Sequence, residues 1–249
     1  MPPATELPEP VMEIAHLYKA FGDNVVLAGF SLTVNRGESV IVLGKSGSGK
    51  SVLIKCIIGL MRPDSGSIKV FGREVTSLSQ DQLDETRVRM GFLFQNNALY
   101  DSMTVRENLE FPLRRHSINL SREETEQLVL EALSDVGLEH TVDMMPVELS
   151  GGMRKRIALA RTLILKPDII LYDEPTTGLD PITGREIIRL MIGIQKKYGS
   201  SSLIISHDMN CVRMMGSRII MLIDGICYAE GSYETLKQSA DVKIKNFFE

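Results

Sequence analysis

The sequence predicts an α/β protein built on a parallel sheet with helices on both faces. Short apolar stretches of strand length alternate with helix-length amphipathic stretches over much of the chain, which is typical of a sheet buried on both sides. The segment 11–34 instead alternates apolar and polar residues, and the segment 96–166 has helical patterns without a clear strand. We therefore expect a parallel core, an antiparallel β subdomain at the start and a helical insertion in the middle.

Composition places the chain among ordinary globular proteins. It has 249 residues, 43% hydrophobic and 24% charged, with a formal net charge of −4, so it lacks the strongly basic footprint of a nucleic-acid-binding protein. Its three cysteines share no close spacing, which excludes a disulfide framework and a cysteine zinc site. No apolar stretch approaches the ~20 residues of a membrane helix. Residues 1–10 are proline-rich, lack signal-peptide features and predict a flexible tail before one cytoplasmic domain over 11–249.

The elements are expected in the following order. The first segment forms antiparallel strands joined by a turn at residues 22–24. Ser121 with Glu124 three residues later is a capping-box signature for a helix start. Further strands are expected at 40–43, 67–71, 90–94, 168–172, 202–205, 218–223 and 226–230. Helices are expected at 51–60, 105–115, 121–137, 151–165 and 183–198, followed by a C-terminal amphipathic stretch.

A glycine-rich loop between a strand and a helix predicts a phosphate-binding site. It matches the pattern G-x-x-x-x-G-K-[ST] through Gly44, Lys45, Ser46, Gly47, Ser48, Gly49, Lys50 and Ser51. The glycines let backbone N–H groups and the helix start close on phosphate oxygens. We expect Lys50 to bind the β- and γ-phosphates and Ser51 to bind Mg²⁺. A chance Gly/Ser-rich turn is the alternative, and the flanking strand and helix argue against it.

Two carboxylates follow the apolar strand over 168–172. Asp173 and Glu174 stand where the carboxyl end of a parallel strand carries the ligand site. We expect Asp173 to hold Mg²⁺ and Glu174 to accept a proton from an attacking water. An isolated Asp-Glu pair is more often a solvated turn, so this interpretation depends on the phosphate loop elsewhere in the chain.

A third motif, Leu149-Ser150-Gly151-Gly152-Met153, opens a helix and provides a second anion-binding N-terminus. It resembles the LSGGQ signature of ABC-transporter ATPases, and with the other motifs the resemblance covers the chain from about residue 12 to its end. The resemblance implies a P-loop NTPase fold with a RecA-like core, and ATP and Mg²⁺ as cofactors. It also implies a homodimer in which Ser150, Gly151 and Gly152 of one subunit close on the γ-phosphate held by the other.

The resemblance also implies roles for single residues. Gln95, after the strand over 90–94, would sense Mg²⁺ and the attacking water, and His207 would contact the γ-phosphate. Asp180, in Gly-Leu-Asp, matches the D-loop that the family places in its nucleotide sites. Phe21 matches the aromatic residue that stacks on adenine, with Tyr18 as its competitor. The alternative for Phe21 is a place in the core of the first hairpin.

Two residues depart from the family pattern. Met153 stands where the signature usually has glutamine, a position peripheral to phosphate binding, so we expect activity to survive. Lys45 stands where proline or another small residue is common. It is expected either to add a phosphate or sugar contact or to face solvent.

The segment after Gln95 resembles one branch of the family, the MlaF-like ATPases of Mla/Mce-type phospholipid transporters. The resemblance rests on 96–108, on 111–116 with Arg115 as a departure, and on Asp-Pro-Ile-Thr at 180–183. It implies a membrane permease and an Mce-type lipid-binding protein as partners, with the ATPase peripheral on the inner membrane through the permease. Ala98, Leu99 and Tyr100 would line a groove for a permease helix. Internal packing of the insertion is the alternative for these residues.

Three other functions stay open. An importer ATPase for amino acids or metals often carries a regulatory domain, for which we expect the chain to be too short. A cell-division or lipoprotein-release ATPase usually has a different segment after Gln95. A soluble ABC protein of DNA repair or translation needs a coiled-coil insert or a second ATPase core. The basic residues 154–156 are interpreted as a solvated helix face, and no nucleic-acid partner is expected.

Overall fold

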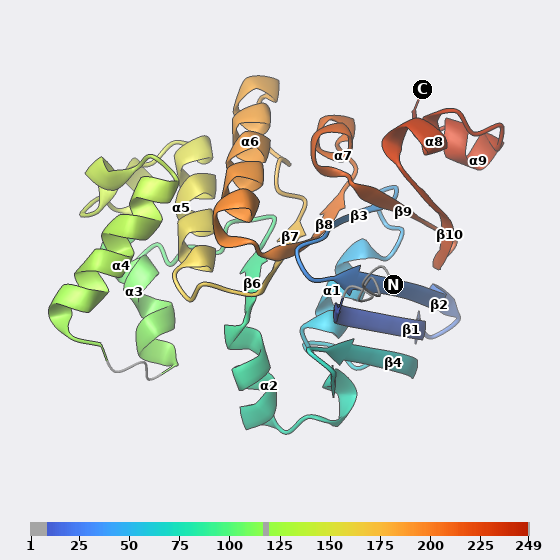
Figure 1. The fold of residues 1–249 in the computed structure, drawn as a ribbon, viewed down its shortest axis with the longest axis horizontal. Helices are drawn as coiled ribbons and strands as arrows, with labels where there is room; N and C mark the ends of the chain where they lie inside the picture. The colour runs from blue at the N-terminus through green and yellow to red at the C-terminus, as the bar shows by residue number, and fades with distance from the viewer. Residues whose placement is uncertain (1–8, 117–119, 249) are drawn as a thin grey trace, which may run out of the picture.

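The N-terminal part of the chain forms an antiparallel sheet. The computed structural model describes residues 9–116 and 120–248, so the first eight residues of the predicted tail lie outside it. Strand order is β2-β1-β4-β5. The bounds are β1 (Pro10–Phe21), β2 (Asn24–Asn35), β4 (Ser65–Val70) and β5 (Arg73–Glu74). The predicted antiparallel subdomain is thus present, and Figure 1 shows it beside the larger sheet.

The larger sheet has the order β10-β9-β3-β8-β7-β6. The pairs β9–β3, β3–β8, β8–β7 and β7–β6 are parallel, whereas β10 is antiparallel to β9. The bounds are β3 (Ser39–Leu43), β6 (Met90–Leu93), β7 (Ile169–Asp173), β8 (Ser201–Ser206), β9 (Arg218–Ile223) and β10 (Ile226–Gly231). The phosphate loop leaves the carboxyl end of β3, and both candidate carboxylates stand at the carboxyl end of β7, so the sheet brings them to one edge.

The inner strands β3 and β7 are mostly apolar and buried because both of their faces are covered. In β3, Val40 and Val42 pack into a cluster with α1 (Lys50–Ile57) and the antiparallel sheet. Ile41 and Leu43 face the other way, into a cluster with α5, α6 and α7. These helices span Gly151–Leu163, Pro181–Tyr198 and Met209–Met215. The prediction of a parallel sheet with helices on both faces is confirmed.

The helical insertion lies at the opposite end of the molecule from the antiparallel sheet (Figure 1). It contains α3 (Val105–Arg115), α4 (Arg122–Asp135) and α5, which build an apolar cluster of their own. Ser121 caps α4 and forms the predicted capping box with Glu124. Leu99 packs against both this cluster and the cluster of the central sheet, so it joins the insertion to the core.

Some elements were not predicted. Helix α2 (Gln80–Val88) is mostly polar, and its start is fixed by a capping box between Ser79 and Gln82. Helix α7 begins shortly after the end of β8 and is capped by Asp208.

The predicted C-terminal amphipathic stretch forms two short helices, α8 (Tyr233–Lys237) and α9 (Val242–Lys245). Short 3-10 turns occur at Val75–Ser77, Glu139–Thr141 and Pro146–Glu148.

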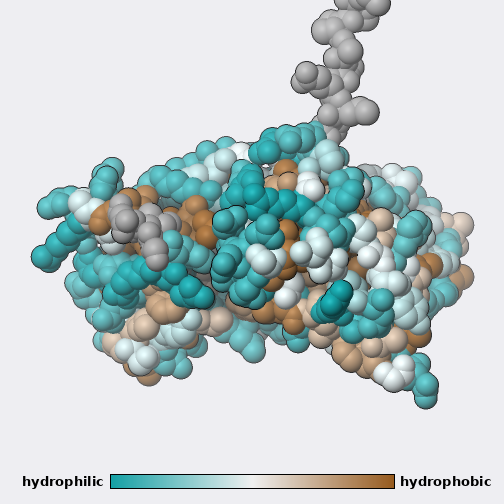
Figure 2. Space-filling model, turned by 90° about the horizontal axis from the view of Figure 1, so that it is seen from below, coloured by the Kyte–Doolittle hydropathy of each residue, from teal (hydrophilic) through white to brown (hydrophobic). Residues whose placement is uncertain are grey.

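The surface carries no large continuous apolar band on the face drawn in Figure 2, where hydrophobic side chains lie in small patches among hydrophilic ones. Across the described residues, none of the helices has both the length and the hydropathy required to span a bilayer. Large exposed apolar side chains include Leu60, Val147 and Ile182.

A buried asparagine orders the loop that leads into α3. Asn108 is fully buried, and its Nδ2 donates to the carbonyl oxygens of Tyr100 (3.1 Å), Met103 (3.1 Å) and Thr104 (3.0 Å). Its Oδ1 accepts from the backbone N–H of Tyr100 at 2.8 Å. Tyr100 O also accepts from the Met103 N–H and Thr104 O from the Asn108 N–H, so the side chain matters most for the Tyr100 N–H and the Met103 carbonyl oxygen.

We expect Asn108→Ala to lower the free energy of unfolding by about 2–4 kcal/mol, because it removes the partner of the Tyr100 N–H and of Met103 O and leaves a small cavity. Urea unfolding followed by circular dichroism measures the change. Asn96→Ala, at an exposed position, is the control and should change stability by no more than about 0.5 kcal/mol. Equal effects of the two variants would contradict the role given to Asn108.

Candidate nucleotide site

The glycine-rich loop folds as a backbone cradle between β3 and α1. Gly49 has φ +98°, in the left-handed region that favours glycine, and a Cβ there would lie 2.8 Å from Val26 Cγ1. Gly47 has φ +79°. Lys50 is 6% exposed, and its Nζ donates to the carbonyl oxygens of Gly44 (2.7 Å) and Lys45 (2.9 Å). The loop therefore wraps around a buried ammonium group, as a phosphate-binding loop requires.

Glu174 is the meeting point of three segments. It is 7% exposed and has φ +50°, a strained conformation for a non-glycine residue that often marks a functional site. Its Oε1 lies 3.5 Å from Lys50 Nζ, and its Oε2 lies 2.8 Å from His207 Nδ1. The backbone N–H of Glu174 donates to Ile205 O at 2.9 Å, which fixes it against β8. Its carboxylate is therefore held between the phosphate loop and the residue that follows β8.

Asp173 has the features of a cation ligand. Its Oδ1 is buried and has no hydrogen-bond partner among the described residues. Burial raises the pKa of this carboxyl, and the neighbouring Glu174 carboxylate raises it further. A buried carboxylate oxygen without a partner is costly, and a divalent cation with oxygen ligands would offset that cost. Asp173 therefore fits the Mg²⁺ site that the sequence predicts.

A pocket of about 310 Å³ brings eight of the predicted site residues together. It lies between the phosphate loop, the end of β7 and the loops that follow β6 and β8. It is lined by Val26, Ser46, Gly47, Gly49, Lys50, Ser51, Val52, Gln95, Glu174 and His207. Residues from five separate parts of the chain thus line one pocket, which contains a cation, a carboxylate, an amide and an imidazole.

The signature motif lies outside this pocket. Ser150 caps α5 by accepting a hydrogen bond from the Met153 N–H at 3.2 Å, and both Ser150 and Gly151 are exposed. A Cβ at Gly151 would meet no heavy atom within 4 Å, whereas a Cβ at Gly152 would lie 2.7 Å from Thr183 Cγ2. At Gly151 the helix start is therefore open to a ligand or a partner. At Gly152 a side chain would collide with Thr183, so this position requires glycine. Asp180 caps α6 and lines a separate hollow with His207.

The candidate adenine residues lie at the margin of the site. Phe21 ends β1 and is 48% exposed, with Lys19 Nζ 5.5 Å from its ring centroid, so it is not part of the hairpin core. Tyr18 is half-buried within β1. Among the residues that the structure describes, neither of these two rings lines the pocket that holds Lys50. Stacking of either Phe21 or Tyr18 on adenine therefore stays a prediction.

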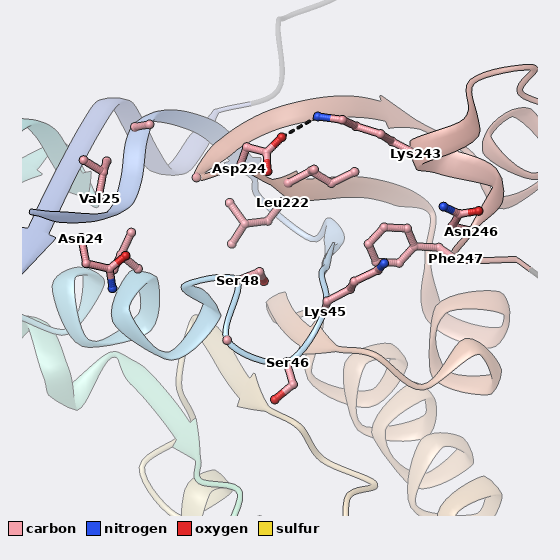
Figure 3. Close-up of a pocket in the computed structure, with 15 residues that line it drawn as sticks. Asn24, Val25, Lys45, Ser46, Ser48, Leu222, Asp224, Lys243, Asn246 and Phe247 are labelled. Carbon is pink, nitrogen blue, oxygen red and sulfur yellow. Dashed lines mark hydrogen bonds and ion pairs between the residues drawn. The ribbon is translucent and has the colours of Figure 1, made fainter.

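Lys45 lines a second, larger pocket of about 690 Å³ beside the phosphate loop (Figure 3). This pocket shares Val26, Ser46 and Gly47 with the first one and also contains Ser48. Lys45 points toward Phe247, with its Nζ 5.7 Å from the ring centroid. Lys45 is exposed, and its ammonium lies near an aromatic ring; its contact with phosphate or sugar stays a prediction.

Residues 154–156 were interpreted as a solvated helix face, and this interpretation is wrong for the middle residue, Lys155. Lys155 is only 2% exposed, and its Nζ donates to the carbonyl oxygens of Phe94 (3.2 Å) and Gln95 (3.0 Å). Burial lowers the pKa of Lys155 to about 8, although the Asp173 carboxylate opposes the shift. The missed signal was helical spacing, because residue 155 lies three and four positions before the buried Ala158 and Leu159.

Residues 98–100 were expected either to line a groove for a permease helix or to pack inside the insertion, and they differ among themselves. Leu99 is internal packing, as described above, whereas Ala98 and Tyr100 are exposed. The Tyr100 ring lies 4.7 Å from the Phe111 ring and 5.8 Å from the Arg161 guanidinium. An exposed aromatic surface therefore exists here, but Leu99 does not contribute to it.

Comparison with known proteins agrees with this geometry. The chain matches the family model of the ABC transporter domain over residues 27–177. It is 39% identical over 230 residues to the methionine import ATP-binding protein MetN of Brucella abortus. That match covers 92% of this chain and 61% of MetN, so the chain spans about three-fifths of that relative's length.

A second relative is matched over more of its length. The chain is 38% identical over 237 residues to the intermembrane phospholipid transport system ATP-binding protein MlaF of Haemophilus influenzae, covering 95% of this chain and 89% of MlaF. A dimeric structure of the ATP-binding cassette MJ0796, in a post-hydrolysis state with ADP and Pi, superposes with a TM-score of 0.80 at 34% identity. It covers 89% of this chain and 98% of the cassette. The family model spans more than half of the chain, and the chain belongs to the ABC transporter family.

Proposed function

We propose that the protein is the ATP-hydrolysing subunit of a membrane transporter. The observation that carries the proposal is the pocket in which the Lys50 cradle, Glu174, Gln95 and His207 meet. Phosphates would lie on the backbone N–H groups of the loop and on the Lys50 ammonium. Phe21 or Tyr18 would stack on the adenine at the margin of the site.

The residues of this pocket divide the work of hydrolysis. The Glu174 carboxylate accepts the proton of the attacking water. Its contacts with Lys50 and His207 hold it in place, because a buried carboxylate needs charged or N–H partners. His207, whose side chain is 59% exposed, faces outward and is free to donate to the γ-phosphate. Gln95 orients the water.

Asp173 and Ser51 are the residues that would hold Mg²⁺, and Gln95 would lie beside the ion. The orphaned Asp173 Oδ1 and the hydroxyl of Ser51 are hard oxygen ligands of the kind that Mg²⁺ prefers. The ion would neutralise charge on the β- and γ-phosphates.

The second half of each site comes from another copy of the chain in this proposal. Ser150 and Gly151 are exposed and lie outside the pocket of their own chain, on a helix start suited to an anion. A twofold-symmetric dimer would place them on the γ-phosphate of the partner and bury two ATP molecules. The dimeric arrangement of the MJ0796 cassette supports this reading.

The proposed cargo is phospholipid, moved between membranes with an Mce-type partner. Two observations support it: the segment after Gln95 resembles that branch, and the match to MlaF covers 95% of this chain and 89% of the relative. The match to MetN, at 39% identity, supports methionine import as the alternative. The ATPase would lie on the cytoplasmic side of the inner membrane, bound to its permease.

Replacement of the proton acceptor tests the chemistry. Glu174→Gln should retain ATP binding and lose hydrolysis by ~10²–10⁴-fold, because the amide keeps the shape but cannot act as a base. The variant should also accumulate an ATP-bound dimer. Phosphate release and size-exclusion chromatography with MgATP measure the two effects. Near-normal turnover would remove Glu174 from the role.

A mixing experiment tests the composite site. Lys50→Ala should weaken ATP binding itself, since it removes a charge that contacts the phosphates in ground and transition states. Ser150→Arg should spare ATP binding by the isolated subunit and block hydrolysis. In a composite arrangement the mixed dimer has one intact site, so mixing the two inactive variants should restore part of the ATPase activity. If each chain used its own signature, the mixture would stay inactive.

The exposed surface after Gln95 provides a test of partner binding. Tyr100→Asp should spare ATP binding and weaken copurification of the permease from membranes, because a carboxylate would have to be buried in an apolar contact. Leu130→Asp on α4 is the matched control, since Leu130 is 41% and Tyr100 42% exposed. Undiminished capture by Tyr100→Asp would exclude this surface.

The cargo is tested on the assembled transporter. In liposomes, ATP turnover by the phospholipid transporter should accompany transfer of a fluorescent phospholipid between vesicles, and phospholipid should be extracted with the purified complex. Stimulation by methionine without lipid transfer would favour the importer instead.

A further inference from the structure

The last residues of β1 extend past the strand that flanks them on one side. The pairing of β1 with β4 ends at Tyr18, which lies opposite Ser65, the first residue of β4. From Lys19 to Phe21, β1 pairs with β2 alone among the described residues. The edge of β1 that faces away from β2 therefore has backbone groups open to partners other than a strand.

Asp64, the residue directly before β4, supplies these partners. Its Oδ2 accepts a hydrogen bond from the Ala20 N–H at 2.7 Å, and its Oδ1 accepts one from Lys19 Nζ at 2.7 Å. Its own backbone N–H donates to Tyr18 O at 2.9 Å. The hydrogen bonds from Lys19 and Ala20 hold the pKa of Asp64 below its usual range. One residue therefore holds three consecutive residues of β1, and we call these contacts the Asp64 clamp.

The clamp lies directly before Phe21. Phe21 follows Ala20 and ends β1 at the turn into β2, where it is paired with Asn24. Lys19 Nζ lies 5.5 Å from the centroid of the Phe21 ring, so the ammonium held by Asp64 also stands beside the aromatic side chain. The ring keeps 48% of its surface exposed, which leaves it open to a ligand. The backbone and the side chain of the clamped strand thus both restrict where this ring can lie.

Asp64 also ends the connection that follows α1. This helix starts within the phosphate loop. At its other end, the backbone N–H groups of Leu60 and Met61 donate to Lys55 O at 2.8 and 3.0 Å, which closes the helix. The short connection 58–64 then leads to the clamp. The clamp therefore ties the end of β1 to the helix that carries the phosphate loop.

We propose that Asp64 is a positioning residue that fixes Phe21 relative to the phosphate loop, so that the base and the phosphates of one nucleotide are bound together. The proposal rests on the proposed function, because it requires a nucleotide in the site. The clamp acts on Phe21 rather than on Tyr18, which is half-buried and flanked by both β2 and β4. It contributes to the affinity for the base and leaves the affinity for phosphate to the loop.

A ligand without a base gives the test. Binding of ATP and of inorganic tripolyphosphate is measured by calorimetry without Mg²⁺, so that neither is hydrolysed. Phe21→Ala should weaken ATP binding by about 5- to 150-fold, the range for loss of one aromatic stack. Asp64→Ala should weaken ATP binding by about three- to tenfold, because the ring loses the hydrogen bonds that hold its strand. Neither variant should change tripolyphosphate binding.

A double-mutant cycle shows whether Asp64 acts through Phe21. In the Phe21→Ala background, Asp64→Ala should change ATP binding by less than about twofold, because no ring remains to be positioned. Asp64→Asn keeps an oxygen acceptor for the Ala20 N–H and should restore most of the ATP affinity. Glu85→Ala is the control and should bind ATP as the parent does, since it removes an exposed ion pair with Arg73, at 3.2 Å, between α2 and β5.

Folding of the variants is checked by thermal melting. The Asp64 side chain is 43% exposed, so its replacement should leave the fold intact. If Asp64→Ala is not folded, Lys19→Met takes its place, because it removes the other half of the ion pair. If tripolyphosphate binds too weakly to be measured, the double-mutant cycle decides the question.

Three results would overturn the proposal. The first is an Asp64→Ala variant that binds ATP as the parent does or loses both ligands equally. The second is an effect of Asp64→Ala that persists in full without the Phe21 ring. The third is an Asp64→Asn variant as weak as Asp64→Ala. If the parent binds neither ATP nor tripolyphosphate, the nucleotide site of the proposed function is wrong, and the positioning role falls with it.

Discussion

The candidate site depends on the burial of one carboxylate, that of Glu174. A charge with 7% exposure is tolerated only with partners, and this one is held by Lys50 from the phosphate loop and His207 from the end of β8. Those residues lie on separate connections of the sheet, so their meeting requires the register of β3, β8 and β7 to be correct. The parallel sheet thus serves to bring three loops within ion-pair distance.

A second buried ammonium, that of Lys155, stands near the same carboxylates. Burial lowers the pKa of Lys155, and Asp173 opposes that shift; burial and Glu174 raise the pKa of Asp173, and Lys50 and Lys155 oppose that rise. Two carboxylates (Asp173 and Glu174) and two ammonium groups (Lys50 and Lys155) therefore lie in a region of low exposure. The negative and positive charges there stabilise one another. The signature helix contributes to the charge balance of the phosphate site without lining its pocket.

Motifs with a strict backbone requirement could be predicted from the sequence. The phosphate loop, the strand-end carboxylates and the Ser121 cap follow from spacing and residue type alone. The burial of Lys155 was indicated only by its helical spacing from Ala158 and Leu159, which a run of three basic residues masked, and its carbonyl partners depend on the tertiary position of the loop after β6. Leu99 was assigned to a groove because composition cannot distinguish an apolar surface from an apolar core. Helix α2 was missed because its residues are mostly polar, so it shows little amphipathic pattern.

The division of the apolar residues into separate clusters has a mechanical consequence. The insertion has a complete core of its own, and it meets the central cluster through Leu99, Leu190 and the sides of α5. A rotation of the insertion as one body would have to separate Ala158, Leu159 and Leu163 of α5 from the central cluster and would expose apolar area to water. Since the heat capacity of a transition scales with the apolar area it exposes, such a rotation should carry a positive heat-capacity change and depend on temperature.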